Sequence, residues 1–412
     1  MLTFEAAVQE MLENNFDIQI ADNSKAIAHQ LNNIGTAGFL PSLSGRAGYE
    51  QAYRNTEQVF FDGRQQGANN ARSSTLTASV LLNWTLFDGM RMFATKSILE
   101  ANEALSDYYL RAAVEEGVVL LGSLYFQIAQ RSKLLELYRN TLLVSRERYQ
   151  LALKRQQIGS GSRQDVLQAL IDLHADSIQL MRTATDIADL KTELNLLLAR
   201  DVTVPVETDL RIPIDTSLTL TVLLEAASKE NTDLLVAREN IRIAQHELRV
   251  ARSYFYPEAG IYAGFDFAKS TSQVGVLQSN RSYGPGVGIF ITYNLFNGLR
   301  DYKNLKVSKI RQENSLIAAA KASASVHAQI LQHYQNYELA KKTLLLEQES
   351  EEKANENLQI ALKKFELGNI TSVEFRSIQL QALEAATRRI NALYAIKMHE
   401  LELSKLAGIM GL

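Results

Sequence analysis

"LFDGMR" at residues 86–91 recurs as "LFNGLR" at residues 295–300, with four of the six residues identical. The two copies lie 209 positions apart, and at this spacing residues 82–199 align with residues 291–408 without a gap. The chain is therefore a tandem duplication. Copies of about 200 residues are too long to be solenoid units, so each copy is expected to form half of one architecture.

Upstream of these segments the spacing becomes 216, which pairs Asn15 with Asn231 and Pro41 with Pro257. The second copy is therefore seven residues shorter between its proline and its strand. We expect three parts in the chain: a first repeat at 1–199, a connector (equatorial) at 200–217 and a second repeat at 218–412.

Composition excludes several classes of protein. The 412 residues carry a net charge of −3, which provides no basic surface and argues against a nucleic-acid partner. The absence of cysteine excludes disulfides and thiolate metal sites. The longest apolar run, Gly117 to Phe126, falls short of the roughly 18 residues of a membrane helix. No signal peptide precedes "MLTFEAAVQE", which fits a cytosolic chain or a mature form with an added Met.

Two proline-free stretches, 42–204 and 286–412, permit very long helices. The stretch from Gly89 to about Ile158 is rich in Ala, Leu, Glu and Arg and predicts a helix of roughly 105 Å. The helix that returns from it has a heptad repeat typical of a coiled coil, formed by Val166, Leu173, Leu180, Ile187 and Leu194. An ordinary long hairpin in a soluble bundle is the alternative.

Segments near the repeated phrase alternate between apolar and polar residues. In "TLTASVLLNWTLF" at 75–87, the residues from Leu76 to Leu86 alternate with Thr, Ser and Asn. A membrane-crossing strand needs about 9–11 residues with its apolar side chains facing lipid. A half-buried soluble sheet would show the same alternation. We predict four strands, at about 42–54, 75–87, 258–268 and 286–296.

The repeated phrase lies where a strand is expected to become a long helix. Asp88 and Asn297 have side chains that can cap the following helix, while Gly89 and Gly298 suit a crowded turn and should tolerate bulky residues poorly. Aromatic residues at these joints, close to Pro41 and Pro257, predict an interfacial belt formed by Trp84, Phe87, Tyr293 and Phe296.

The sequence resembles the TolC-like outer-membrane factor family. The duplication, the joints "LNWTLFDGMR" and "ITYNLFNGLR" and the hairpin tips "RQQIGSGSRQDVLQA" (155–169) and "KFELGNITSVEFRSI" (364–378) carry the resemblance, which covers essentially the whole chain. The opening "LTFEAAVQEMLENNFDI" also resembles the family's mature N-terminus after a cleaved signal.

The resemblance implies an α+β membrane protein built from a tandem structural repeat. It implies a homotrimer in which four strands per chain form a 12-stranded β-barrel in outer-membrane lipid. The barrel would continue into a long α-helical coiled-coil barrel in the periplasm. Its implied function is passive export, as the exit duct of a tripartite efflux or type I secretion system. The implied partners are a periplasmic adaptor (membrane fusion protein) and an inner-membrane transporter.

The two hairpin tips are expected to form the far end of the tunnel. Gly159 and Gly368 should end the descending helices in a left-handed conformation. By resemblance, Asp165 and Glu374 line the periplasmic entrance, where three-fold symmetry would form rings of carboxylates that favour cations. Glu374 is the stronger candidate for the inner ring.

A second interpretation applies to the same carboxylates. Asp165 with Ser162, and Glu374 with Thr371, fit capping boxes at the start of the ascending helices. The two roles are compatible. The tip also departs from the family's gating pattern, because Ile370 stands where an arginine locks the closed tip and Phe365 where a tyrosine is common. Asp165 thereby loses its expected partner, and a closed state must use other contacts.

The chain contains little that points to other chemistry. No two of the six histidines have the i, i+4 spacing of a helical zinc site. The glycine-rich "GPGVG" at 284–288 leads into a strand, and "GSGSRQD" lacks the lysine of a nucleotide-binding loop. We therefore expect no enzymatic activity, no cofactor and no metal. The alternative from another class is a soluble coiled-coil scaffold or adaptor protein.

Overall fold

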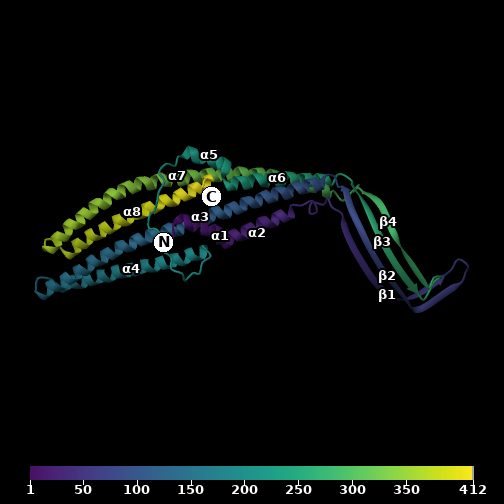
Figure 1. Ribbon diagram of the computed structural model, residues 1–412, viewed down its shortest axis with the longest axis horizontal. Coiled ribbons are helices and arrows are strands. Elements are labelled where there is room, and N and C mark those ends of the chain that lie inside the picture. The colour runs from purple at the N-terminus through teal and green to yellow at the C-terminus, as the bar shows by residue number, and fades with distance from the viewer. Residues whose placement is uncertain (411–412) are drawn as a thin grey trace. The chain divides into compact units, whose positions relative to one another are not determined.

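The computed structural model describes residues 1–410, and its helices and strands follow the same order in both halves of the chain (Figure 1). The first half contains α1 (Phe4–Asn14), α2 (Phe16–Leu31), β1 (Ser42–Val59), β2 (Gln65–Phe87), α3 (Arg91–Gln157) and α4 (Arg163–Leu197). The second half contains α5 (Leu220–Glu230), α6 (Thr232–Ser253), β3 (Glu258–Ser272), β4 (Ser279–Thr292), α7 (Arg300–Glu366) and α8 (Ser372–Ala407).

Two compact units build the chain, and each draws on both halves of the sequence. Unit 1 comprises Met1–Lys25, Ser106–Ala237 and Ala319–Leu412. It is helical, and it contains the tips of the two long hairpins formed by α3 with α4 and α7 with α8. Unit 2 comprises Ala26–Leu105 and Arg238–Ala318, and it contains the four strands and the helix ends that adjoin them.

The core of unit 1 consists of apolar side chains from both hairpins. One buried cluster joins Met11 of α1 to Leu121 and Ile128 of α3 and Leu194 of α4, and a second joins α5, α7 and α8. Helix α3 also holds one 18-residue window apolar enough to cross a membrane by length and composition, with 56% of that window buried. A mostly buried window of this kind is also found in the core helix of a soluble protein, so it is weak evidence for a membrane span.

The duplication is visible as the same hydrogen bonds in both halves. Asn15 and Asn231 precede α2 and α6, and each side-chain oxygen accepts backbone N–H bonds from the first turn that follows. The Asn15 amide donates to the Leu197 carbonyl oxygen at 2.8 Å, and the Asn231 amide donates to that of Leu406 at 2.9 Å. The partners Leu197 and Leu406 are themselves 209 residues apart, so the repeat in sequence is a repeat of interactions.

The strands of unit 2 form one antiparallel sheet in the order β1-β2-β3-β4. Pairing of β2 with β3 joins the two halves of the chain. The predicted bounds were too short for three strands: β1 and β2 continue their pairing to Val59 and Gln65, and β3 extends to Ser272. The predicted bounds of β4 were wrong at both ends, since it begins at Ser279 and ends at Thr292, where its pairing with β3 stops.

The register places apolar residues of all four strands on one face. Leu43 pairs with Leu82, Leu82 with Ala263, and Ala263 with Val287. Cross-strand neighbours share a face of a sheet, so the alternation predicted from the sequence is confirmed. One residue further along, the row Ser44, Leu81, Gly264 and Gly286 lies on the opposite face.

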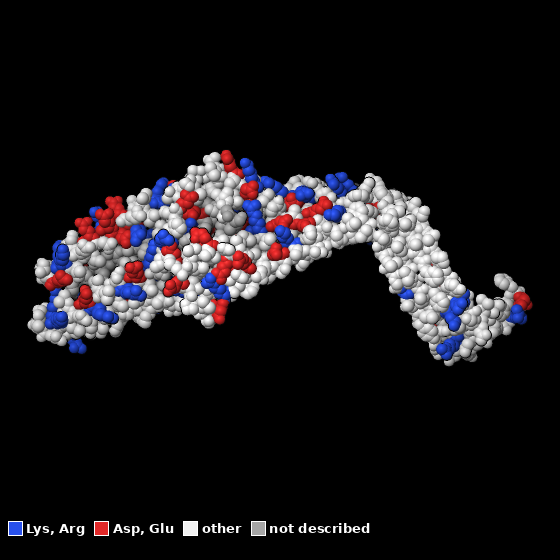
Figure 2. Space-filling model, in the orientation of Figure 1, with Lys and Arg blue, Asp and Glu red and all other residues white. Residues whose placement is uncertain are grey.

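The apolar face of the sheet is uncovered in the chain. Leu43, Val287 and Ile289 are 71%, 82% and 80% exposed. On the face visible in Figure 2, charged side chains are missing from the part of the sheet next to the helices and gather toward the hairpin loops. Among the described residues, β1 and β4 each pair with a strand on one side only. A sheet with two open edges and an exposed apolar face requires further partners.

Candidate functional site at the hairpin tips and strand–helix joints

The two hairpin tips have the same backbone conformation. Helix α3 ends at Gln157, Gly159 has a φ of +78°, and the Ser160 N–H donates to the Arg155 carbonyl oxygen at 2.9 Å. In the second tip, Gly368 also has a φ of +78°, and the Asn369 N–H donates to the Lys364 carbonyl oxygen at 2.8 Å. Both are Schellman motifs, so the predicted left-handed glycines are confirmed.

Each ascending helix begins with a capping box. The Ser162 hydroxyl accepts the Asp165 N–H at 3.1 Å, and the Asp165 carboxylate accepts the Ser162 N–H in return. Thr371 and Glu374 make the same reciprocal pair, with distances of 3.1 Å and 2.8 Å. The capping interpretation of both carboxylates is therefore confirmed. The hydrogen bonds from the Thr371 N–H and hydroxyl lower the pKa of Glu374.

Most of the predicted tip residues surround one cavity of about 320 Å³. Its lining includes Asp165 from the first tip and Phe365, Gly368, Ile370, Thr371 and Glu374 from the second. Gly159 and Ser162 lie in the turn of the first tip but do not line this cavity. The cavity lies within unit 1 and has both carboxylates on its wall.

Arg155 connects the two tips. Its guanidinium lies 5.0 Å from the centroid of the Phe365 ring and donates to the Phe365 and Glu366 carbonyl oxygens at 2.7 and 3.3 Å. These carbonyl groups are at the C-terminal end of α7, where a cation is favoured. Arg155 was not among the predicted site residues, because nothing in its local spacing shows that it faces a residue 210 positions away.

Phe365 and Ile370, the two departures from the family pattern, have apolar roles. The Phe365 ring stacks on Phe375 with centroids 5.0 Å apart, and both rings are buried. Ile370 packs against the same cluster, together with Val144 and Leu151 of α3. The second tip is therefore anchored by ring packing and by Arg155.

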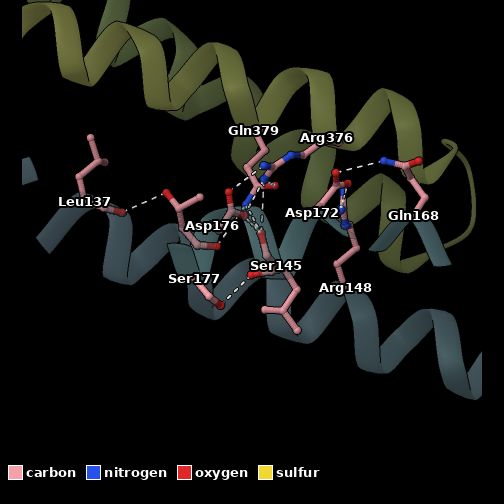
Figure 3. Close-up of polar contacts among 11 residues, drawn as sticks. Leu137, Ser145, Arg148, Gln168, Asp172, Asp176, Ser177, Arg376 and Gln379 are labelled. Atoms are coloured by element: carbon pink, nitrogen blue, oxygen red, sulfur yellow. Dashed lines mark hydrogen bonds and ion pairs between the residues drawn. The ribbon is translucent and has the colours of Figure 1, made fainter. Parts of the chain in front are cut away.

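A buried polar network joins the two hairpins further along the helices (Figure 3). Arg376 of α8 makes two hydrogen bonds to the Asp176 carboxylate of α4, at 2.7 and 2.8 Å. Ser145 of α3 donates to the same carboxylate at 2.5 Å, and Gln379 accepts from Arg376 at 3.0 Å. Three helices thus meet at one carboxylate that is shielded from water.

Arg148 adds a second buried ion pair to this region. Its guanidinium contacts the Asp172 carboxylate, and its side chain is 1% exposed. The Nε and Nη1 atoms of Arg148 have no hydrogen-bond partner among the described residues. Buried donors without acceptors are destabilising, and loss of either partner of a buried ion pair leaves a further uncompensated charge, so we expect this region to be sensitive to substitution.

The strand–helix joints in unit 2 differ between the repeats. Each joint has two consecutive residues with positive φ, Gly89 and Met90 at the first and Gly298 and Leu299 at the second, so the difference lies in the side-chain hydrogen bonds. At the first joint, the Asp88 carboxylate accepts the Met92 N–H at 3.0 Å. Asp88 therefore caps α3, as predicted. At the second joint, Asn297 donates its amide to the Asp301 carboxylate instead.

The two joint glycines also have different surroundings. A Cβ on Gly89 would lie 2.5 Å from the Ser253 carbonyl oxygen, whereas a Cβ on Gly298 would meet no atom within 4 Å. Both residues have φ near +70°. The expectation that both joints are crowded is therefore wrong for Gly298 within the chain, although its left-handed conformation still favours glycine.

The expected aromatic belt is only partly on the strands. Trp84 and Phe87 belong to β2, and the Trp84 indole donates to the Phe39 carbonyl oxygen at 2.8 Å. Tyr293 and Phe296 follow the end of β4 and are exposed. Pro41 and Pro257 immediately precede β1 and β3, where a missing N–H is tolerated.

The sequence profile of the outer membrane efflux protein family matches residues 7–200 and 223–409. The chain belongs to this family. A relative, the alkaline protease secretion protein AprF of Pseudomonas aeruginosa, is 24% identical over 308 residues. This match covers 74% of the chain and 63% of AprF.

Solved structures of outer-membrane proteins have the same fold. The Campylobacter jejuni CmeC outer membrane channel superposes with a TM-score of 0.80 at 16% identity, covering 98% of this chain and 85% of CmeC. The Vibrio cholerae outer membrane protein VceC gives a TM-score of 0.78 at 16% identity, with 98% and 96% covered. The mostly helical chain with one four-stranded sheet therefore has the fold of these outer-membrane proteins.

Proposed function

We propose that this family member is a subunit of an outer-membrane channel that serves as the passive exit duct of a tripartite efflux or type I secretion system. The four-stranded sheet carries the proposal, because it has two open edges and an exposed apolar face. The name of AprF refers to protease secretion and the description of CmeC to a channel, which supports export as the general role.

Trimerisation follows from the sheet. Open sheet edges are not tolerated in lipid, because their backbone groups would lack hydrogen-bond partners. Two chains would supply eight strands, a barrel that side chains fill, whereas three would supply twelve and leave a lumen. We infer a homotrimer, with the apolar face toward outer-membrane lipid and with Trp84, Phe87, Tyr293 and Phe296 at the interface.

The hairpin tips form the periplasmic entrance in this proposal. Asp165 and Glu374 line one cavity, and three copies would place rings of carboxylates around the opening. A periplasmic adaptor would bind the helical hairpins and connect the channel to an inner-membrane transporter. Residues 1–199 and 218–412 act as the two repeats and residues 200–217 as their connector. Export through such a duct requires no catalytic step in this chain.

Cell fractionation and native mass spectrometry test the proposal. We expect the protein in the outer-membrane fraction, soluble only with detergent, and a trimeric mass in detergent. A protein that stays in solution without detergent would instead be the alternative, a coiled-coil scaffold or adaptor. Only monomers or dimers in detergent would contradict the trimeric barrel while leaving the membrane location intact.

A further inference from the structure

A cavity of about 490 Å³ lies in unit 2, between the start of α3 and the end of α6. Gly89 forms part of its wall, where the β2–α3 turn approaches the Ser253 carbonyl group too closely for any side chain. Its volume is within the range of small-molecule sites. No tip residue contributes to it, so it is separate from the proposed entrance.

One side of this cavity is apolar. Phe87, Met90, Phe93 and Tyr256 line it, and Met90 and Phe93 are 60% and 57% exposed. Phe87 pairs with Ala259, which in turn pairs with Ile291 on the apolar face of the sheet. The apolar lining is therefore continuous with the face that would contact lipid.

The other side of the cavity is cationic. Arg249 and Arg252 of α6 line it, and no Asp or Glu does. Arg249 contacts a ring nitrogen of His246 at 3.4 Å rather than a carboxylate. The Arg252 carbonyl oxygen accepts the Phe255 N–H at 3.1 Å, but its guanidinium has no hydrogen-bond or ion-pair partner within residues 1–410. Guanidinium groups bind phosphate oxygens through paired N–H donors, so the cavity offers an anion site beside an apolar surface.

We propose that this cavity binds an anionic phospholipid, with its phosphate group on Arg249 and Arg252 and an acyl chain along Phe87, Met90 and Phe93. This inference rests on the proposed outer-membrane location, because the site lies at the end of the sheet where the aromatic interface is expected. The continuous apolar lining favours a lipid over free phosphate, which would leave that surface in water.

Native mass spectrometry in detergent with added phosphatidylglycerol or phosphatidylcholine of the same chain length tests the site. We expect at least about five-fold more phosphatidylglycerol adducts, and loss of that preference in the double variant Arg249→Gln/Arg252→Gln. Arg242→Gln is the matched control, because Arg242 lies on the same helix and pairs with Glu239 at 2.8 Å. This control should keep the preference. Unchanged oligomeric mass in each variant shows that folding is intact.

Two results would overturn the proposal. The first is equal binding of the two lipids by a wild-type protein that fractionates with the outer membrane. The second is full competition by inorganic phosphate at the lipid's own concentration, which would make the cavity a site for free anions. Failure of outer-membrane fractionation would instead contradict the proposed function, so the two failures are distinguishable. Phe93→Ser should weaken binding of both lipids, because it removes apolar lining without changing charge.

Discussion

Arg155 of the first hairpin tip lies over the ring of Phe365 in the second, 5.0 Å from its centroid, and donates to the Phe365 carbonyl oxygen at 2.7 Å. The Arg155 side chain thus donates hydrogen bonds to carbonyl oxygens at the C-terminal end of α7 and joins the two hairpins. Ile370 stands where the family pattern has an arginine, so Asp165 lacks that partner, as the sequence indicated. The observed link uses a cation from the other hairpin and needs no carboxylate.

Replacement of Arg155 by alanine should loosen the second tip. We expect faster amide hydrogen exchange at residues 364–370, corresponding to about 1–2 kcal/mol of lost local stability, from the cation–π contact and hydrogen bonds to a charged donor. Lys154→Ala, which removes an exposed cation next to it, should leave exchange unchanged. Equal exchange in the wild type and Arg155→Ala would show that the contact does not hold the tip.

The Asp176–Arg376 pair should contribute to stability through its burial. Asp176→Asn or Arg376→Met alone leaves a charge without its partner, at a cost of about 3–5 kcal/mol, whereas the double variant Asp176→Asn/Arg376→Met should recover much of that loss. Thermal unfolding followed by circular dichroism measures each variant. Strictly additive losses in the double variant would mean that the two residues act independently.

The same network should restrain the proposed entrance. Arg376 and Asp176 come from different hairpins. The two hairpins can therefore move apart here only if this ion pair is broken. We expect Arg376→Met to give a larger or longer-lived open conductance in planar bilayers than wild type. Arg388→Met is the control, since Arg388 pairs with Glu347 within the second hairpin only. Identical conductance in wild type and Arg376→Met would leave the network a purely stabilising role.

Gly89 and Gly298 allow the cost of a crowded Cβ to be compared with that of an uncrowded one in the same protein. Gly298→Ala should cost about 1 kcal/mol, the strain of a left-handed alanine. Gly89→Ala should cost clearly more, because its Cβ would also collide with the Ser253 carbonyl group. Thermal stability of the two variants measures the difference. Equal losses would mean that neighbouring subunits crowd Gly298 as much as the chain crowds Gly89.

Local patterns in the sequence were sufficient to predict the hydrogen bonds at the hairpin tips and the apolar face of each strand. Gly159 and Gly368, and the pairs Ser162–Asp165 and Thr371–Glu374, interact within a few residues, so their spacing alone predicts the contacts. Alternation predicted which face of each strand is apolar. Strand ends were less accurate, because the mostly polar residues 55–74 lack the apolar alternation on which the strand prediction relied, although β1 and β2 remain paired there.

Contacts between the hairpins could not be predicted in this way. Asp176 and Arg376 are 200 residues apart, and Arg155 and Phe365 are 210 apart. The repeat spacing relates equivalent residues, but it does not identify which residues of one repeat face the other. Gly89 and Gly298 also lie in similar sequence contexts, "LFDGMR" and "LFNGLR", yet only the fold shows that a carbonyl group lies beside one of them.

The carboxylates of the proposed entrance should determine ion preference. Glu374→Gln and Asp165→Asn keep the size of each side chain and remove its charge. In single-channel recordings we expect reduced cation preference and weaker block by divalent cations, with the larger effect in Glu374→Gln. Unfolding measurements and trimer mass verify that the variants are assembled. Unchanged selectivity in both variants, with intact trimers, would limit these carboxylates to their capping role.

The pH dependence of Glu374 follows from its hydrogen bonds. The Thr371 N–H and hydroxyl lower its pKa, so the side chain stays ionised at a lower pH than an ordinary glutamate. Its stabilising effect is present above the pKa of the unfolded chain and is lost as pH falls through the lower, folded-state pKa. We therefore expect the cation preference due to Glu374 to persist below about pH 4.3, the usual pKa of glutamate, and to disappear only in stronger acid.

Thr371→Val removes the hydroxyl donor and should move that loss of cation preference to higher pH, while Ser377→Ala, a turn further along α8, should not. If the midpoint is the same in Thr371→Val and wild type, the capping hydroxyl does not control the charge of Glu374.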